Sequence, residues 1–274
     1  MIKDITLGQF FPGKSFLHRL DPRTKLLASI LYIVAIFCAK NVFCFLAIAL
    51  SIVVLDALSG INPKTLLRGV RPILYVLVFT VVISIFWTKG ETLLVDWGPI
   101  EIYLEGIYRA LLMALRVVVL IMGTSLLLTY TTSPIALTDG LEAILSPLRY
   151  LKVPVHSFSM MMTIALRFIP TLIEETDKIM SAQKARGADF SNGGIVKRAK
   201  ALIPVLIPLF VSSFKRAEDL AVAMECRCYR GGEGRTKMSK LKFGFSDFVM
   251  LFMSAAFIVL IVLGNRYIPI GFSI

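Results

Sequence analysis

The amino-acid sequence predicts an all-α, polytopic membrane protein with about five transmembrane helices and a large set of helices on the cytoplasmic side. Hydrophobic residues make up 57% of its 274 residues and charged residues only 18%, whereas an average soluble domain is about 45–50% apolar and about 25% charged. The mean hydropathy is +0.78. This composition excludes a disordered chain and argues strongly against a soluble single domain. Helix is the expected state of the apolar segments because open strand edges cannot be satisfied in lipid.

Five long apolar runs predict the transmembrane helices, since a helix needs about 20 mostly apolar residues to cross a bilayer. Polar or charged residues, glycine or proline bound most of these runs, as Lys40 and Asn41 do after the first and Lys89 and Gly90 do after the third. The first and third runs are short and need flanking residues to reach the full thickness. In chain order the runs are residues 26–39, 42–58, 73–87, 106–129 and 247–263.

The excess of positive charge predicts how these spans are oriented. Thirty Lys and Arg against eighteen Asp and Glu give a net charge of +12, and cytoplasmic loops of membrane proteins are rich in Lys and Arg. The segment before residue 26 and the 59–72 loop are basic, whereas residues 89–105 hold one lysine and four acidic residues. The alternation puts the N-terminus inside, residues 89–105 outside and the C-terminus outside. It accounts for the basic residues without a nucleic-acid partner.

Residues 132–245 form the unusual part of the chain, because they are basic and also contain two apolar pieces, 158–173 and 201–214. Arg167 and Pro170 interrupt the first piece, and Pro204 and Pro208 interrupt the second. If both pieces crossed the membrane, the basic segment between them would lie outside, against the charge rule. We interpret both as helices at the cytoplasmic face; the alternative that one of them is a span stays open. The predicted division is 1–131 with four spans, 132–245 as a cytoplasmic helical region, and 246–274 with the last span and the tail.

Each apolar piece continues into an amphipathic helix that ends in an arginine between small residues. The first helix starts with acidic residues near 174 and ends at Arg186, followed by Gly187, which complements the helix dipole and suits a helix end. The second carries Arg227 in its final turns and is expected to end at the glycines 231 and 232. Ordinary helix capping is enough to explain one such helix end with its arginine. Small neighbours also leave a guanidinium free to enter a groove and bind a carboxylate with two hydrogen bonds.

The N-terminal stretch G-Q-F-F-P-G-K-S at residues 8–15, with L-H-R-L-D-P-R-T-K at 17–25, resembles the opening of the transmembrane coupling (T) subunit of energy-coupling-factor (ECF-type ABC) transporters, the EcfT/CbiQ-like family. The triplets Ala185-Arg186-Gly187 and Cys226-Arg227-Cys228 resemble that family's paired Ala-Arg-Gly signatures. The likeness covers nearly the whole chain. The second triplet departs from the pattern at both flanking positions, which puts the role of the glycine in question at Cys228.

The resemblance implies a membrane coupling or scaffold subunit of an ECF-type importer in a prokaryotic cell membrane, serving uptake of vitamins or metal ions. Its implied partners are two ABC ATPase subunits at the cytoplasmic face, a substrate-binding (S) membrane subunit and the lipid bilayer. Long coupling helices would carry ATPase motion to the S subunit. The implied ATPase-docking residues are Ala185, Arg186, Gly187, Cys226, Arg227 and Cys228. The resemblance implies no catalytic residue, metal site or cofactor in this chain, because ATP and Mg²⁺ would be bound by the ATPase subunits.

Other functional classes fit the residues less well. No G-x-x-x-x-G-K-[ST] motif occurs, so the chain is not itself expected to be an ATPase. The adjacent Glu174 and Glu175 resemble the paired glutamates of membrane endopeptidases, but the chain has two histidines in all and neither is suitably placed. A stand-alone secondary transporter or channel is the remaining alternative, although the paired repeats with broken helices that typify transporters are not evident.

Two further features are left open by the sequence. Arg116 lies deep in the fourth predicted span and is either a functional site or a structural partner of a carboxylate. An apolar face on the cytoplasmic helices is either a static core or an adaptable surface for a partner, as methionine would favour. Its members are Met160, Met161, Met162, Leu202, Leu206 and Leu209.

Overall fold

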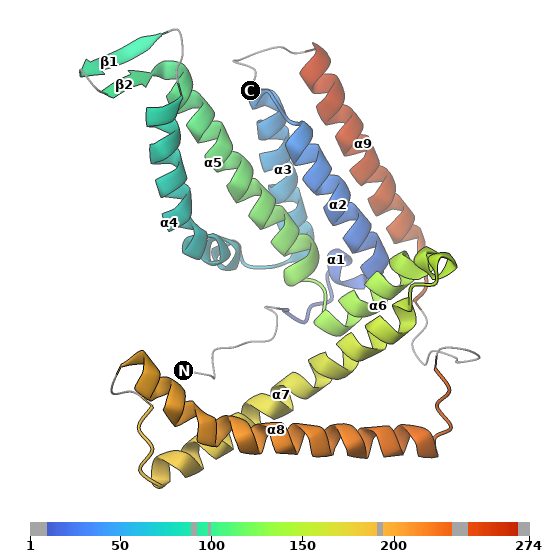
Figure 1. The fold of residues 1–274 in the computed structure, drawn as a ribbon. Helices are drawn as coiled ribbons and strands as arrows, with labels where there is room; N and C mark the ends of the chain where they lie inside the picture. The colour runs from blue at the N-terminus through green and yellow to red at the C-terminus, as the bar shows by residue number, and fades with distance from the viewer. Residues whose placement is uncertain (1–9, 89–91, 98–99, 191–193, 232–240, 268–274) are drawn as a thin grey trace. The chain divides into compact units, whose positions relative to one another are not determined.

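The computed structural model describes residues 10–88, 92–97, 100–190, 194–231 and 241–267. These residues fall into two compact units, each considered on its own below. The bundle unit comprises residues 10–141 and 241–267, and the paired-helix unit comprises residues 142–231. Nearly all of the described secondary structure is helical, which confirms the predicted all-α class (Figure 1).

The bundle unit is built from long helices that run up and down (Figure 1). Its longest members each contain one predicted apolar run. The helices are α1 (Phe16–Arg19), α2 (Pro22–Cys38), α3 (Val42–Ser59), α4 (Pro63–Trp87), α5 (Leu104–Thr124), the π-helical turn η1 (Ser125–Thr129) that continues α5, and α9 (Phe245–Tyr267). Helix α6 (Pro134–Leu145) crosses the boundary between the two units.

Local sequence signals explain where several of these helices begin and end. The side chains of Asp21 and Asn62 accept hydrogen bonds from the N–H groups of Arg23 and Lys64, and a proline opens each helix, as is typical of helix starts. Gly60 ends α3 in the left-handed conformation, with φ +67°. Helix α4 begins ten residues before the third apolar run, which was expected to need flanking residues, and it continues through Pro72.

Five helical segments within the described ranges are long and apolar enough to cross a membrane, which makes the chain a multi-pass membrane protein. They are Val42–Ser59, Pro63–Trp87, Leu104–Thr129, Val155–Ala185 and Phe245–Tyr267. The spans predicted from sequence included the 26–39 run, nearly all of which lies in α2, and did not include the 158–173 piece, which lies in the Val155–Ala185 helix. Helix α2 has 17 residues and is the shorter candidate, whereas the Val155–Ala185 helix is the least apolar of the five. Length and composition alone do not decide between them, so the predicted set of spans stays a prediction.

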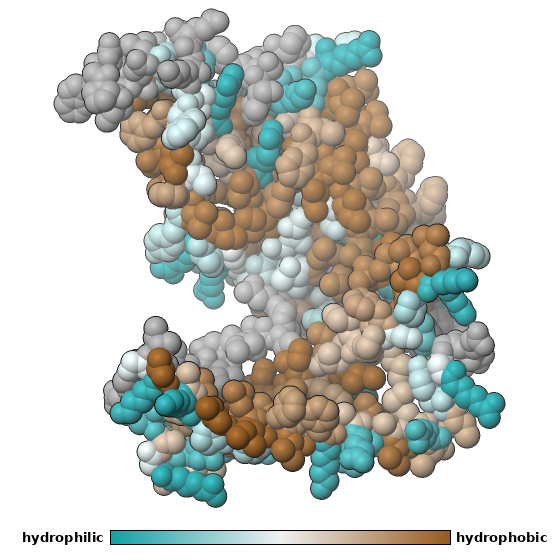
Figure 2. All heavy atoms as spheres, in the orientation of Figure 1, coloured by the Kyte–Doolittle hydropathy of each residue, from teal (hydrophilic) through white to brown (hydrophobic). Residues whose placement is uncertain are grey.

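The core of the bundle unit is formed by apolar side chains from α2, α3, α5, η1 and α9, among them Ile36, Phe45 and Leu126, all fully buried. The outer faces are also apolar. Tyr75, Phe79 and many other large side chains are exposed, and Figure 2 shows brown hydrophobic surface over the middle of the bundle with hydrophilic residues toward its ends. Apolar side chains on both the inside and the outside are expected of helices surrounded by lipid.

A small β-hairpin, which the sequence analysis did not predict, connects α4 to α5. Strands β1 (Leu93–Trp97) and β2 (Ile100–Tyr103) pair in antiparallel fashion, with Val95 opposite Ile102. The predicted outside loop 89–105 therefore contains regular structure. A usable signal was present, because two runs of strand-favouring residues flank the pair Gly98-Pro99.

Arg116 pairs with a backbone carbonyl, whereas the structural alternative that the sequence left open beside a functional site was a carboxylate. Its Nη2 donates a hydrogen bond to the backbone carbonyl of Ala39 at 2.9 Å, and its guanidinium lies 5.4 Å from the ring centre of Phe45. Ala39 follows the last residue of α2, where helix carbonyls lack intrahelical partners and favour a cation. Arg116 thus ties α5 to the end of α2.

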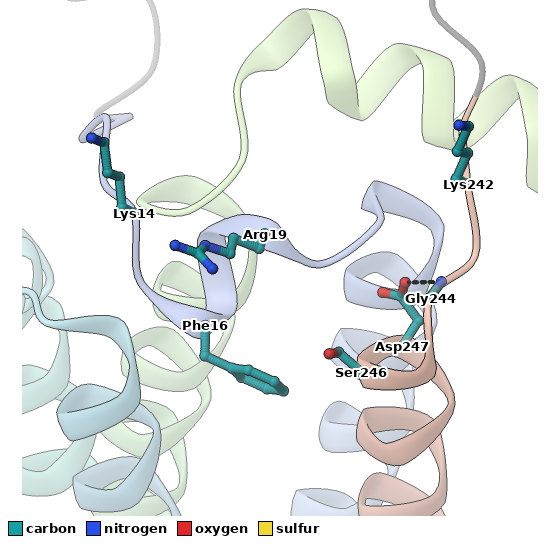
Figure 3. A pocket seen from close by; sticks show the side chains of 7 residues that line it. All are labelled: Lys14, Phe16, Arg19, Lys242, Gly244, Ser246 and Asp247. Carbon is teal, nitrogen blue, oxygen red and sulfur yellow. Dashed lines mark hydrogen bonds between the residues drawn. The ribbon is translucent and has the colours of Figure 1, made fainter.

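Asp21 and Lys25, from the second part of the N-terminal motif that carries the family resemblance, form a buried clamp at one end of the bundle unit. The carboxylate of Asp247 accepts one hydrogen bond from the backbone N–H of Asp21 and one from that of Gly244, both at 2.8 Å; Figure 3 shows the bond with Gly244. Lys25, which is 2% exposed, donates to the carbonyl of Thr131 at 2.8 Å. These bonds join the starts of α2 and α9 to the turn after η1. The motif therefore has an architectural role in the bundle.

Candidate functional site: the paired coupling helices

The candidate site lies on two long helices of the paired-helix unit, α7 (Val155–Ala185) and α8 (Ile195–Cys226), which follow the short 3₁₀ helix η2 (Ser146–Leu151). Figure 1 shows α7 and α8 crossing, with a bend in the N-terminal third of α8. The predicted short helix starting near residue 174 was wrong: each apolar piece and its amphipathic continuation form one unbroken helix, with Pro170 inside α7 and Pro204 and Pro208 inside α8. Internal prolines bend helices without always ending them.

An ion pair holds the two helices together near the middle of their contact. Arg216 of α8 donates from Nη2 to a carboxylate oxygen of Glu175 on α7 at 2.9 Å, and Ser212 donates to the other oxygen. The Arg216 guanidinium also lies 5.9 Å from the ring centre of Phe168. The sequence did not predict this ion pair, because several charged residues on each helix were equally available as partners.

Two further contacts show that the helices run antiparallel. Near the end of α7, the amide of Gln183 donates to the carbonyl of Pro204, and just past the end of α8 the hydroxyl of Tyr229 donates to the sulfur of Met160. Arg186 and Arg227 therefore lie at opposite ends of the pair. The helical path from residue 204 to residue 227 measures about 35 Å at the normal helical rise.

The end of α7 is closed by a Schellman motif around Arg186. The N–H of Gly187 donates to the carbonyl of Lys184, and the N–H of Ala188 donates to that of Gln183, both at 3.0 Å. Gly187 has φ +88°, the left-handed conformation that glycine adopts without steric cost. The glycine therefore turns the chain away directly after Arg186.

The end of α8 has the same geometry, although the sequence departs from the family pattern there. The N–H of Cys228 donates to the carbonyl of Glu225 at 2.8 Å, and that of Tyr229 donates to the carbonyl of Met224 at 3.1 Å. Cys228, with φ +55°, occupies the left-handed position that Gly187 occupies in α7. The prediction that the helix would reach the glycines 231 and 232 was wrong, because α8 ends at Cys226.

All six predicted docking residues are exposed at these two ends: Ala185, Arg186, Gly187, Cys226, Arg227 and Cys228. Within the described ranges, Arg216 forms an ion pair with Glu175 and the His156 imidazole contacts the Glu142 carboxylate, and neither contact includes Arg186 or Arg227. Two guanidinium groups are thus presented to solvent at hydrogen-bonded helix ends. The described residues contain no group of three His, Cys, Asp or Glu side chains that could hold a metal ion.

An exposed apolar stripe runs along the middle of α8. Its members follow the 3-and-4 spacing of one helix face, and Phe210 packs edge-on against Phe214 at 4.7 Å between ring centres. Of the predicted adaptable surface, Met161, Met162, Leu202 and Leu206 are exposed, whereas Met160 and Leu209 are half-buried. The α8 stripe consists of Ile203, Leu206, Ile207, Phe210, Val211 and Phe214.

Comparison with known proteins shows which family has this architecture. Residues 13–238 match the CbiQ family, described as a cobalt transport protein. The chain belongs to the CbiQ family. The match covers the N-terminal clamp segment from residue 13, helices α1 to α8 and both arginine ends.

Curated relatives of this CbiQ-family chain carry the name energy-coupling factor transporter transmembrane protein EcfT. The relative from Thermosediminibacter oceani is 52% identical over 246 residues, covering 90% of this chain and 92% of its own length. The one from Ruminiclostridium cellulolyticum is 50% identical over 263 residues, covering 96% and 98%. The one from Bacillus subtilis is 47% identical over 241 residues, covering 88% and 91%.

These similarities confirm the resemblance inferred from the arginine triplets and the N-terminal motif. The chain is a transmembrane coupling subunit of the energy-coupling-factor class, and the alternative of a stand-alone secondary transporter or channel is not favoured. A subunit of such a transporter works with partner subunits.

Proposed function

We propose that this chain couples two ABC ATPase subunits to a substrate-binding (S) membrane subunit, with Arg186 and Arg227 as the two ATPase-docking points. The observation that carries the proposal is the pair of matching helix ends, each with an exposed arginine directly before a left-handed residue. Their placement at opposite ends of one antiparallel pair suits one contact with each of two ATPase subunits.

Docking would place each guanidinium in an ATPase groove lined by carboxylate or carbonyl oxygens. Arginine suits this role because its planar group forms two parallel hydrogen bonds with a carboxylate. The small flanking residues Ala185 and Cys226 leave room for groove walls on either side of the helix end. The ATPase subunits bind ATP and Mg²⁺ and carry out hydrolysis, so the chain itself needs no cofactor.

Movement of the ATPase subunits would then be transmitted as displacement of the helix ends. Helices α7 and α8 are continuous, and the Glu175–Arg216 ion pair ties them together between those ends. A change in the spacing of Arg186 and Arg227 would therefore alter how the two helices cross. The α8 stripe offers an apolar face through which that change can reach the S subunit, leading to uptake of a vitamin or metal ion.

Copurification tests the docking points. The double variant R186E/R227E should lose most of its copurifying ATPase subunits, because reversing both charges repels the carboxylates that would bind arginine. Insertion into the membrane should be unchanged, since both residues are exposed at helix ends. The ratio of ATPase subunit to tagged chain after affinity purification is the quantity to measure.

A matched control separates docking from a general effect of charge. Arg149 and Lys215 are also exposed cations of the paired-helix unit but lie away from the two helix ends, so R149E/K215E should retain the ATPase subunits. Normal copurification of R186E/R227E would contradict the docking role. Equal loss in both double variants would contradict it as well, because net charge would then explain the result.

A further inference from the structure

The short helix η2 and the turn that follows it form an exposed tip at the junction of α6 and α7 (Figure 1). Every residue from Ser146 to Pro154, called the η2 tip below, is exposed, and Tyr150 and Leu151 are 93% and 75% exposed. Most of these exposed side chains are apolar, which marks a surface that meets a protein or a membrane. The apolar members are Pro147, Leu148, Tyr150, Leu151, Val153 and Pro154.

The helical register of η2 separates its apolar side chains from its polar ones. In a 3₁₀ helix, residues three apart in sequence lie in one row along the axis. Two of the three rows of η2 are apolar, and the third is polar and contains a cation. The rows are Leu148 with Leu151, Pro147 with Tyr150, and Ser146 with Arg149. A helix divided in this way can lie in the plane of a membrane interface with its apolar side toward the acyl chains.

Backbone hydrogen bonds hold the tip in this shape. The N–H of Lys152 donates to the carbonyl of Arg149 at 3.0 Å, and the N–H of Val153 donates to the carbonyl of Leu148 at 3.4 Å. Together they form a Schellman motif, with Lys152 in the left-handed conformation at φ +60°. The apolar side chains are thus presented on an ordered turn, and carbonyls at its end already have partners. Satisfied carbonyls lower the cost of moving the turn out of water.

The charge around the tip favours an anionic membrane surface over a protein groove. Residues 143–173, which include the tip and the first half of α7, contain no acidic residue. Arg149 and Lys152 are exposed and take part in none of the ion pairs between described residues. Their long side chains can reach lipid phosphates while their stems lie along apolar surface, and tyrosine is enriched at membrane interfaces. The charge rule puts this region on the cytoplasmic side, where the leaflet is anionic.

We propose that the η2 tip inserts into the headgroup region of the cytoplasmic leaflet, with its two apolar rows toward the acyl chains and Arg149 and Lys152 at the lipid phosphates. The exposed apolar surface continues along the chain onto the first turns of α7, where Phe158 and Met161 are 50% and 61% exposed. Insertion would hold the start of α7 at the membrane. It does not depend on ATPase docking, so R149E/K215E should still retain the ATPase subunits.

Fluorescence quenching by brominated lipids tests the insertion with the full chain in nanodiscs that contain phosphatidylglycerol or phosphatidylcholine. In a W87F/W97F background, Y150W reports on the tip and S181W on the exposed second half of α7. Lipids brominated at different depths should place Y150W about 5–10 Å below the membrane surface, whereas S181W should be quenched only by iodide in the water. Quenching of Y150W by iodide as strong as that of S181W would overturn the proposal. Shielding of Y150W that appears only after partner subunits are added would overturn it in favour of a protein contact.

A pair of matched variants separates the tip from the general basic character of the paired-helix unit. R149Q/K152Q should lower the insertion equilibrium constant of the tip by at least about tenfold in phosphatidylglycerol, because each cation near an anionic surface contributes roughly fivefold. In phosphatidylcholine the quenching of Y150W should not change. K197Q/K200Q removes two exposed cations at the start of α8 and should leave the quenching unaltered in both lipids. Equal weakening by both variants would sink the assignment to the η2 tip, since diffuse attraction would then explain the result.

Discussion

At the scale of single residues, Cys228 adopts the left-handed backbone conformation at the end of α8 that Gly187 adopts at the end of α7. A non-glycine residue in this conformation costs about 1–2 kcal/mol, yet the hydrogen bonds that close α8 match those that close α7. The backbone geometry at the two helix ends is therefore the same, although Cys228 stands where α7 has Gly187. Local strain at Cys228 is the consequence.

Because of this strain, introducing glycine at residue 228 and removing it at residue 187 should change the stability of the two helix ends in opposite directions. C228G should stabilise the end of α8 by about 0.5–1 kcal/mol, because relief of the steric cost exceeds the added freedom of the unfolded chain. G187A should destabilise the end of α7 by about 1 kcal/mol, since φ there is +88°. Amide hydrogen exchange at residues 186–188 and 227–229 measures both changes. Faster exchange at residues 227–229 in C228G would contradict the assigned geometry.

The two arginine triplets could be located from sequence because small residues and a basic helix end are local signals. The identity of the left-handed residue in the second triplet could not, since cysteine has little tendency to adopt φ > 0. The glycines after residue 230 seemed the better helix end for that reason. In the structure Gly231 also has a positive φ of +85°, but it belongs to the segment after the helix.

At the scale of elements, sequence predicted the apolar parts of helices better than their ends. Helix α3 starts at the predicted residue and ends one residue later, because Asn41 and Gly60 flank an uninterrupted apolar run. Helix α4 was underestimated, because its first turns are basic and Pro72 looked like a boundary. The continuity of α7 and α8 was missed for a similar reason: apolar and amphipathic halves have different patterns but the same helical period.

The pairing of α7 with α8 rests partly on Glu175 and Arg216, and a double-mutant cycle measures this. E175Q and R216Q should each lower the free energy of unfolding by about 1 kcal/mol, as expected for a partly exposed ion pair with short hydrogen bonds. The double variant should lose less than the sum of the single variants, with a coupling of roughly 0.5–1 kcal/mol. Unfolding of the purified chain in detergent is the measurement.

Glu174 and Lys215 provide the matching control cycle, since they are the chain neighbours of the paired residues and take part in no ion pair between described residues. Variants E174Q and K215Q should combine additively. A coupling of the same size in this control cycle would show a general charge effect between the helices. Additive behaviour of E175Q and R216Q would show that their contact does not hold the pair together.

At the scale of the whole molecule, composition was enough to predict a multi-pass membrane protein, and charge alternation was enough to propose its orientation. Sequence could not predict which helices are neighbours. The parallel pairing of α2 with α9 depends on contacts more than 220 residues apart, such as Asp21 with Asp247 and the amide of Asn265 with the carbonyl of Cys38. Such contacts leave no periodic signal within either helix.

The proposed orientation can be tested with the chain's own cysteines. Cys226 and Cys228 are exposed, whereas Cys44 is buried and Cys38 half-buried. If residues 132–245 face the cytoplasm, a membrane-impermeant maleimide should leave intact cells unlabelled and label the chain only after permeabilisation. Replacing the two exposed thiols in C226A/C228G should remove that labelling. Gel-shift or mass analysis of the purified chain gives the extent of reaction.

A cysteine introduced next to the hairpin, which is predicted to lie outside the cell, tests the other side of the membrane. Thr92 is exposed and directly precedes the hairpin, so T92C in the C226A/C228G background should be labelled in intact cells. The two results together would place the hairpin outside and the end of α8 inside, as the charge rule requires. Labelling of the native Cys226 and Cys228 in intact cells would show that the orientation is the reverse of the proposed one. It would then also put Arg186 and Arg227 out of reach of any cytoplasmic ATPase, so this one measurement bears on the docking proposal as well.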